Sequence, residues 1–157
     1  MHIKNTGKRA ERKLAMTSTT IFEELIDAIG ARDLDRTMDC FTADVHYEEP
    51  AFGWDLHGLE EVREMYGPWF TNANLDTTLD DAFTAGDRGA FQFTMRGTIL
   101  KELPGVWSTD AVGRIFTIRL AGVARLSPDG RMAELILYWD FVTLLSHIGE
   151  FHHEGLA

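Results

Sequence analysis

The chain has 157 residues and a mass of 17.7 kDa, enough for one domain with a sizeable core. Hydrophobic residues make up 45% and charged residues 25%, and no apolar run approaches the ~20 residues of a membrane span. Cys40 is the one cysteine, which excludes an internal disulfide and a disulfide-stapled secreted scaffold. We therefore expect a cytoplasmic protein that does not act at a membrane.

The charge is distributed unevenly along the chain, whose formal net charge is −10. Residues 1–17 carry five basic side chains and one acidic side chain, whereas the remainder carries 10 basic and 24 acidic ones. Because an acidic body repels phosphate backbones, nucleic acid is not an expected partner. We expect a disordered basic extension at 1–17 (unless Met16 is the true start), one domain at 18–150 and a tail at 151–157.

Two helices are predicted at the start of the domain. Apolar residues recur at helical spacing over residues 20–30, after a capping-box pattern that begins at Thr20. Gly30 can end this helix. Asp33 can cap a second, shorter helix, since aspartate is a favoured N-cap residue.

A strand, a loop and a third helix are expected next. Residues 44–49 are predicted to form a strand that stops at Pro50, and a loop follows over 51–57. Apolar residues at helical spacing predict a third helix over 59–70. The pair Gly67-Pro68 inside it predicts a break or a kink.

The second half is rich in strand-forming residues. Strands are predicted near 75–85, 89–102, 111–126 and 131–141, joined by turn residues, and a short helix is predicted over 141–148. The order ααβαββββ is typical of an α+β fold. We expect a curved antiparallel or mixed sheet that wraps around the three helices as a cone and encloses a pocket.

The last predicted strand is apolar on both sides. Its alternate residues Ile136, Tyr138 and Asp140 are predicted to point inward, which leaves Leu135, Leu137 and Trp139 on the outer face. An outer face of that kind would be an exposed apolar patch. The expected partner is therefore a second copy of the chain, in a homodimer over the outer face of the sheet.

Two stretches resemble a known superfamily. They are the run from Glu49 to Gly58 with the helix start after it, and the run from Asp129 to Met132 that leads to Tyr138-Trp139-Asp140. With the helix-helix-strand start, residues 18–150 resemble the nuclear-transport-factor-2-like superfamily, in its SnoaL-like polyketide cyclase and ketosteroid isomerase branch. The resemblance implies a cystatin-like fold. This fold hosts isomerases, cyclases, dehydratases, epoxide hydrolases and binding proteins, so it does not specify one activity.

The resemblance also implies roles for single residues. Ketosteroid isomerases keep their general base where Glu49 lies, nine positions before the helix-opening Gly58. Their two oxyanion donors correspond to positions at or near Leu25 and Gly122, which have no side-chain donor, so steroid isomerisation is not expected. SnoaL-like cyclases keep an acid/base aspartate at the end of the last strand, where Asp140 fits. Related epoxide hydrolases add an Arg-x-Asp pair that this sequence lacks.

Physical arguments support the same two carboxylates, with alternatives. If Asp140 faces an apolar cavity, its pKa should be raised toward a useful range, or else it only caps the final helix. Pro50 restricts Glu49 to an extended backbone; Glu49 either points inward together with Tyr47 or ends a solvated strand. Two carboxylates in one dry cavity would divide the roles of acid and base.

Other residues are candidates for substrate binding. Trp54 either walls the pocket entrance or packs a loop, and Tyr138 is predicted to reach a ligand carbonyl. His57 is either a proton carrier at the rim or a loop hydrogen-bonder. Tyr47 is expected on the cavity side with Glu49. No cofactor or metal is expected, since phosphate-binding loops and Cys-x-x-Cys are absent and the histidines near the C-terminus form only a loose cluster.

These observations predict a SnoaL-like pocket protein. It is expected to be a cofactor-independent enzyme that transfers protons by acid/base chemistry, in an isomerisation, cyclisation or dehydration. The predicted ligand is a hydrophobic cyclic or polyketide-like carbonyl compound. The alternative is a non-catalytic small-molecule-binding or dimerisation module of the same fold.

Overall fold

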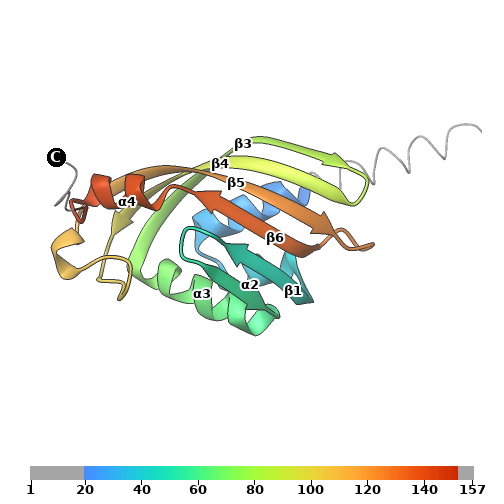
Figure 1. Cartoon of the computed structure of the whole chain (residues 1–157), viewed down its shortest axis with the longest axis horizontal. Coiled ribbons are helices and arrows are strands. Elements are labelled where there is room, and N and C mark those ends of the chain that lie inside the picture. Colours follow the sequence, from blue (N-terminus) through green and yellow to red (C-terminus); the bar gives the residue numbers. More distant parts are fainter. Residues whose placement is uncertain (1–19, 152–157) are drawn as a thin grey trace, which may run out of the picture.

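The computed structural model describes residues 20–151 (Figure 1). A helix covers residues 20–31. The elements after it are α2 (Leu34–Asp39), β1 (Phe41–Glu49), β2 (Trp54–His57), α3 (Leu59–Asn72), β3 (Ala73–Ala85), β4 (Arg88–Ile99), the short 3₁₀ helix η1 (Thr109–Ala111), β5 (Ile115–Leu126), β6 (Met132–Trp139) and α4 (Phe141–Ile148).

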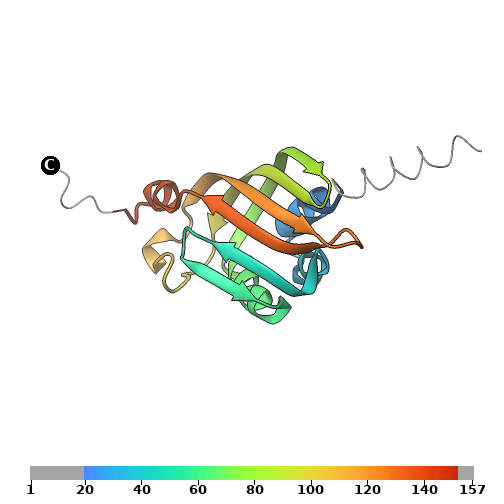
Figure 2. The ribbon, with the colours of Figure 1, turned by 45° about the vertical axis from the view of Figure 1, so that its right-hand side comes forward.

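All six strands belong to one mixed sheet, in the order β2-β1-β6-β5-β4-β3. Strands β1 and β6 are parallel, and every other neighbouring pair is antiparallel. The sheet curves, and the helix at 20–31, α2 and α3 lie on its inner side (Figures 1 and 2). The prediction of an α+β fold, with helices covered by a curved mixed sheet, is confirmed.

Three local predictions need correction. Strand β2 occupies residues 54–57, which we predicted as loop, because a four-residue strand gives almost no periodic signal. The strands predicted to end near 102 and to begin near 111 end at Ile99 and begin at Ile115, and η1 lies in the connection between them. Helix α3 continues through Gly67-Pro68, because packing of its apolar face outweighs the hydrogen bond lost at proline.

The core between helices and sheet is aromatic and tightly packed. Phe22, from the first helix, stacks on Phe91 of β4 with ring centroids 4.7 Å apart. Gly122 on β5 lies directly under the Phe91 ring, where a Cβ would come within 2.3 Å of it. Gly30 has a packing role as well, since a Cβ there would lie 2.4 Å from Thr77 Oγ1. The helix continues past Gly30, and the left-handed residue after it is Arg32, with φ 53°.

Strand β6 faces opposite to the prediction. Leu135 and Leu137 are buried, and Trp139 lines the interior, whereas Tyr138 is 48% exposed on the outer face. Alternation fixes which residues share a face but not which face is inner, and here both sets are apolar. The residues from which we predicted a dimer are therefore core residues.

The predicted extension at 1–17 and nearly all of the predicted tail at 151–157 lie outside the described residues. Within residues 20–151, no helix combines the length and the apolar character needed to cross a bilayer.

Candidate active site

A cavity of about 40 Å³ lies between the inner face of the sheet and the helices. Most of its walls are apolar, from Ile29 on the first helix to Phe93, Ile118 and Leu137 on the sheet. Among the described residues that line it, five carry a polar side-chain group: Tyr47, Glu49 and Tyr66, and the indoles of Trp69 and Trp139. The volume can hold a water but is far below the ~300 Å³ of a typical ligand site. A larger ligand therefore requires side chains to move.

Glu49 is the one carboxylate among the described lining residues. As the last residue of β1, Glu49 points inward with Tyr47, which is the inward alternative of the prediction. Only 5% of its surface is exposed. Trp139 Nε1 donates to Glu49 Oε1 at 2.7 Å, and the Tyr47 hydroxyl donates to Oε2 at 3.1 Å. Burial raises the pKa of Glu49 to about 7, although these two hydrogen bonds favour the charged form. The carboxyl is thus near half-ionised at neutral pH.

Glu49, Tyr47 and Tyr66 form a short hydrogen-bonded chain. The Tyr47 and Tyr66 hydroxyl oxygens are 3.4 Å apart. Because the single proton of Tyr47 goes to ionised Glu49, Tyr66 is the donor to Tyr47. Burial raises the pKa of both tyrosines, so both hydroxyls keep their protons at neutral pH. At 3.4 Å, the hydrogen bond from Tyr66 to Tyr47 is the weakest of the chain.

Aromatic rings cover the Glu49 end of the cavity. Phe52, in the loop between β1 and β2, lies 5.2 Å from the ring of Trp139 and 6.3 Å from that of Trp69. It also contacts Phe141, at the start of α4, at 5.0 Å. Trp69 and Trp139 both line the cavity, so Phe52 packs against two of its walls near the carboxylate.

Asp140 does not face the cavity, so the prediction of a second inward carboxylate is wrong. It is exposed and caps α4: Oδ1 accepts from the backbone N–H groups of Val142 and Thr143. Oδ2 accepts from the Thr143 hydroxyl at 2.7 Å. These hydrogen bonds lower the pKa of Asp140 instead of raising it. The helix-capping alternative describes this residue.

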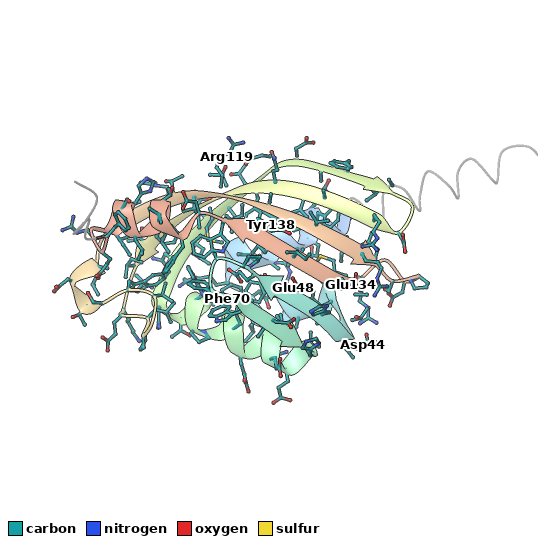
Figure 3. All side chains as sticks on the ribbon, in the orientation of Figure 1. Asp44, Glu48, Phe70, Arg119, Glu134 and Tyr138 are labelled. Atoms are coloured by element: carbon teal, nitrogen blue, oxygen red, sulfur yellow. The ribbon has the colours of Figure 1, made fainter. Side chains whose placement is uncertain are left out.

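The structure separates three predicted substrate-binding residues from the cavity. Tyr138 lies on the outer face of the sheet (Figure 3). Trp54 is half-buried and stacks on Phe52 at 4.4 Å, outside the cavity lining, as its packing alternative describes. The His57 side chain is 66% exposed and lies 3.3 Å from Asp55 on the outer face. Of the predicted site residues, only Glu49 and Tyr47 meet at the cavity.

Two site residues were missed from the sequence. Trp139 was assigned to the outer face, and Tyr66 was not assigned to the site. Both assignments follow from treating each element alone. Parallel pairing of β1 with β6 sets Tyr47 beside Leu135 and Glu48 beside Ile136, and so brings the next residues along β6 toward Glu49. A pairing of that kind joins segments 90 residues apart, and no local pattern encodes it.

A family model and solved structures are similar to this chain. The SnoaL-like domain model matches residues 22–135, and no curated protein is similar in sequence. TsrD from Streptomyces laurentii matches with a TM-score of 0.74 and 21% identity, covering 87% of this chain and 97% of its own.

Two further structures share the fold. IdmH from Streptomyces antibioticus, named as a candidate polyketide cyclase, has a TM-score of 0.70 and 23% identity, covering 84% of this chain and 98% of its own. An LEH-like epoxide hydrolase from M. tuberculosis has a TM-score of 0.67 and 14% identity, covering 85% and 90%. The match to the SnoaL-like family model spans most of residues 20–151, and these solved structures share the fold described above. The chain belongs to the SnoaL-like domain family.

Proposed function

We propose that this protein is a cofactor-independent enzyme that transfers protons on a hydrophobic carbonyl compound, with Glu49 as its acid/base group. The observation that carries the proposal is a carboxyl buried in an apolar cavity with a pKa of about 7. A base of this pKa is efficient near neutral pH, because a large fraction is ionised and its proton affinity is still substantial. Isomerisation, cyclisation and dehydration all begin with the step this group can perform.

In that step, the Glu49 carboxylate removes a proton from the carbon next to the ligand carbonyl. The C–H electron pair becomes the C=C bond of an enolate, and the charge moves to the carbonyl oxygen. Protonated Glu49 then returns the proton to another carbon, to a leaving hydroxyl as water departs, or to the alkoxide formed when the enolate attacks a second carbonyl. No step consumes an oxidant or a reductant.

The enolate oxygen needs a hydrogen-bond donor, and Tyr66 can supply one. Its hydroxyl is 3.4 Å from Tyr47, a weak contact that a ligand oxygen can replace. Tyr47 and Trp139 hold the two oxygens of Glu49 and keep the carboxylate in place. We assign proton transfer to Glu49, oxyanion donation to Tyr66, and positioning of the carboxylate to Tyr47 and Trp139.

One observation favours the alternative of a non-catalytic binding protein. Asp140 is outside the cavity, so the cavity does not contain the two carboxylates that would divide the roles of acid and base. It contains the carboxylate of Glu49 and the weakly hydrogen-bonded hydroxyl of Tyr66. A ligand that only fills the apolar space beside Trp69 and Trp139 would need no proton transfer. Both functions use the same cavity and the same class of hydrophobic ligand.

We also propose a homodimer over the outer face of the sheet. Its apolar residues differ from those predicted: Phe83, Val123 and Tyr138 are 62%, 46% and 48% exposed. Two shallow depressions on this face share Gln92 and Ala121, so the exposed apolar surface extends from β3 to β6.

The test is exchange of carbon-bound protons with solvent. A bicyclic ketone such as 2-decalone is incubated with the protein in D₂O, and deuterium uptake next to the carbonyl is followed by nuclear magnetic resonance. Glu49→Gln should slow the catalysed exchange at least ~100-fold, the usual contribution of a general base. Tyr66→Phe should slow it by a smaller factor, and Glu48→Gln, on the opposite face of β1, should leave it unchanged.

Ligand binding is measured in parallel by quenching of tryptophan fluorescence. Binding retained in Glu49→Gln, with exchange lost, supports the enzyme. Binding without exchange in the wild-type protein supports the binding protein. Equal exchange by wild-type and Glu49→Gln proteins contradicts the role of Glu49.

A further inference from the structure

We propose that His46, Asp55 and His57, assisted by Glu48, form a zinc-binding site on the outer face of the β1–β2 hairpin. The site is independent of the Glu49 cavity, which lies on the other side of the same strand. No metal is expected from the sequence, which lacks Cys-x-x-Cys, and His46 and His57 come together only through the pairing of β1 with β2.

Antiparallel pairing brings these four side chains together. His46 is paired with His57, and Glu48 is paired with Asp55, in consecutive outward positions of the two strands. Residues two apart on a strand share a face, and directly opposed residues have Cβ atoms about 5 Å apart. The hairpin therefore carries a square of two imidazoles and two carboxylates, all on one face.

Two contacts in this group already have the separation that zinc requires. The ligand atoms of His46, Asp55 and His57 all lie within 4.8 Å of one another. Tetrahedral zinc, with bonds of about 2.0–2.2 Å to nitrogen and oxygen, holds its ligand atoms about 3.3 Å apart. The contact from His57 Nε2 to Asp55 Oδ1 is 3.3 Å, and that from His46 Nε2 to Glu48 Oε1 is 3.4 Å.

One distance must lengthen for a cation to enter. His46 Nε2 and Asp55 Oδ1 are 2.5 Å apart, as in a hydrogen bond, so a cation would replace the shared proton. Both side chains can move, because both have solvent on one side: His46 is 37% and Asp55 64% exposed. The two imidazole rings are stacked with centroids 4.5 Å apart and planes 10° apart, and both Nε2 atoms approach the same oxygen, Asp55 Oδ1.

The surrounding charge favours a cation. Asp44 and Glu48 on β1 and Glu134 on β6 lie around the site (Figure 3), and Glu134 is the register partner of His46. Arg125 forms an ion pair with Glu134 at 3.2 Å, which withdraws that carboxylate from the set of ligands. Two histidines with one or two carboxylates are a ligand set that zinc accepts.

Zinc at this place would join the two strands on either side of the Phe52 loop. The next register pair along the hairpin is Glu49 with Trp54, and between them the chain turns through Phe52, which covers the cavity. A ligand that binds only the folded hairpin stabilises the folded state, so zinc should raise the melting temperature as well as bind.

The experiment is zinc titration of the full chain after treatment with EDTA and dialysis, followed by calorimetry and by thermal unfolding. We expect the wild-type protein to bind one zinc ion per chain. In His46→Asn and in His57→Asn, the affinity for zinc should fall at least tenfold. Asp55→Asn should weaken binding as well. The matched control is His147→Asn. His147 lies on α4, where its imidazole accepts a hydrogen bond from the backbone N–H of Thr117, so this variant should bind zinc as the wild type does.

His152 and His153 lie outside the described residues, so the titration is repeated in a His152→Asn, His153→Asn background, where the site should persist. Histidine ring signals should identify the ligands: on adding zinc, those of His46 and His57 shift in nuclear magnetic resonance spectra. Absence of binding at 1 mM zinc would overturn the proposal, as would unchanged affinity in His46→Asn and His57→Asn. A circular dichroism spectrum like that of the wild type shows that each variant is folded.

Discussion

At the scale of single residues, the environment of Glu49 determines its chemistry. Its neighbour Glu48 is on the same strand but points outward, with a half-exposed side chain. Glu49 is 5% exposed and has two hydrogen-bond donors, yet its pKa is raised because desolvation outweighs them. One peptide unit thus separates a surface carboxylate from an interior group that titrates near neutral pH.

This difference predicts how stability depends on pH. Between the ordinary glutamate pKa of 4.5 and about 7, the folded protein holds a proton that the unfolded chain has released. The unfolding free energy should therefore fall as pH rises through this window, by roughly 3 kcal/mol in total from Glu49. Glu49→Gln removes this loss, so its stability relative to the wild type should increase from pH 4.5 to pH 8.

The measurement is urea unfolding of the wild type, Glu49→Gln and the matched surface variant Glu48→Gln at both pH values. If the difference between the wild type and Glu49→Gln is the same at pH 4.5 and pH 8, Glu49 does not titrate in this window and the proposed base is lost.

The indole of Trp139 should tune the same carboxyl. Its N–H donates to Glu49 Oε1 at 2.7 Å and favours the ionised form. Trp139→Phe keeps an aromatic ring and removes the donor, so the pKa of Glu49 should rise above about 7. The Glu49 side-chain carbonyl signal, followed by nuclear magnetic resonance through a pH titration, measures this change.

Trp54→Phe is the control, since Trp54 stacks on Phe52 and its indole is not among the partners of Glu49. If the pKa of Glu49 is unchanged or lower in Trp139→Phe, the argument from the indole hydrogen bond is contradicted.

At the scale of elements, capping explains Asp140. The residue accepts from two backbone N–H groups in the first turn of α4, which would otherwise lack partners. Asp140→Ala should lower the free energy of unfolding, and Asp140→Asn should retain most of it, because asparagine also caps helices. Neither change should alter proton exchange on a ketone beyond its effect on folding.

Urea unfolding and the exchange assay on the same two variants check this expectation. If a stably folded Asp140→Asn protein no longer catalyses exchange, Asp140 takes part in proton transfer and the prediction is contradicted.

Element-level patterns account for what could be predicted. Asp33 as an N-cap and the helix over 141–148 follow from local chemistry, and both are present. Glu49 could be placed inward with Tyr47 because alternation along one strand links them. The inner face of β6, strand β2 and the zinc ligands could not be placed, because each depends on pairing between segments distant in sequence.

At the scale of the whole molecule, the proposed dimer depends on the outer face of the sheet. Phe83, Val123 and Tyr138 are exposed there, while Arg119 projects from β5 and β3 carries acidic residues (Figure 3). A two-fold axis sets the same patch against itself, so apolar residues can be buried while the basic and acidic parts of the two copies face each other.

The expected solution mass by light scattering is therefore twice 17.7 kDa at micromolar concentration. Val123→Glu lies at the middle of this face and should yield a monomer, because a charge without a partner would be buried in the interface. Val142→Glu is the matched control: Val142 is 49% exposed on α4, away from the sheet face, and its substitution should leave the mass unchanged. Trp139→Glu should instead destabilise each chain, because that side chain lies against the cavity. A mass of one chain for the wild type, or a dimer that survives Val123→Glu and dissociates with Val142→Glu, would remove the outer face as the interface.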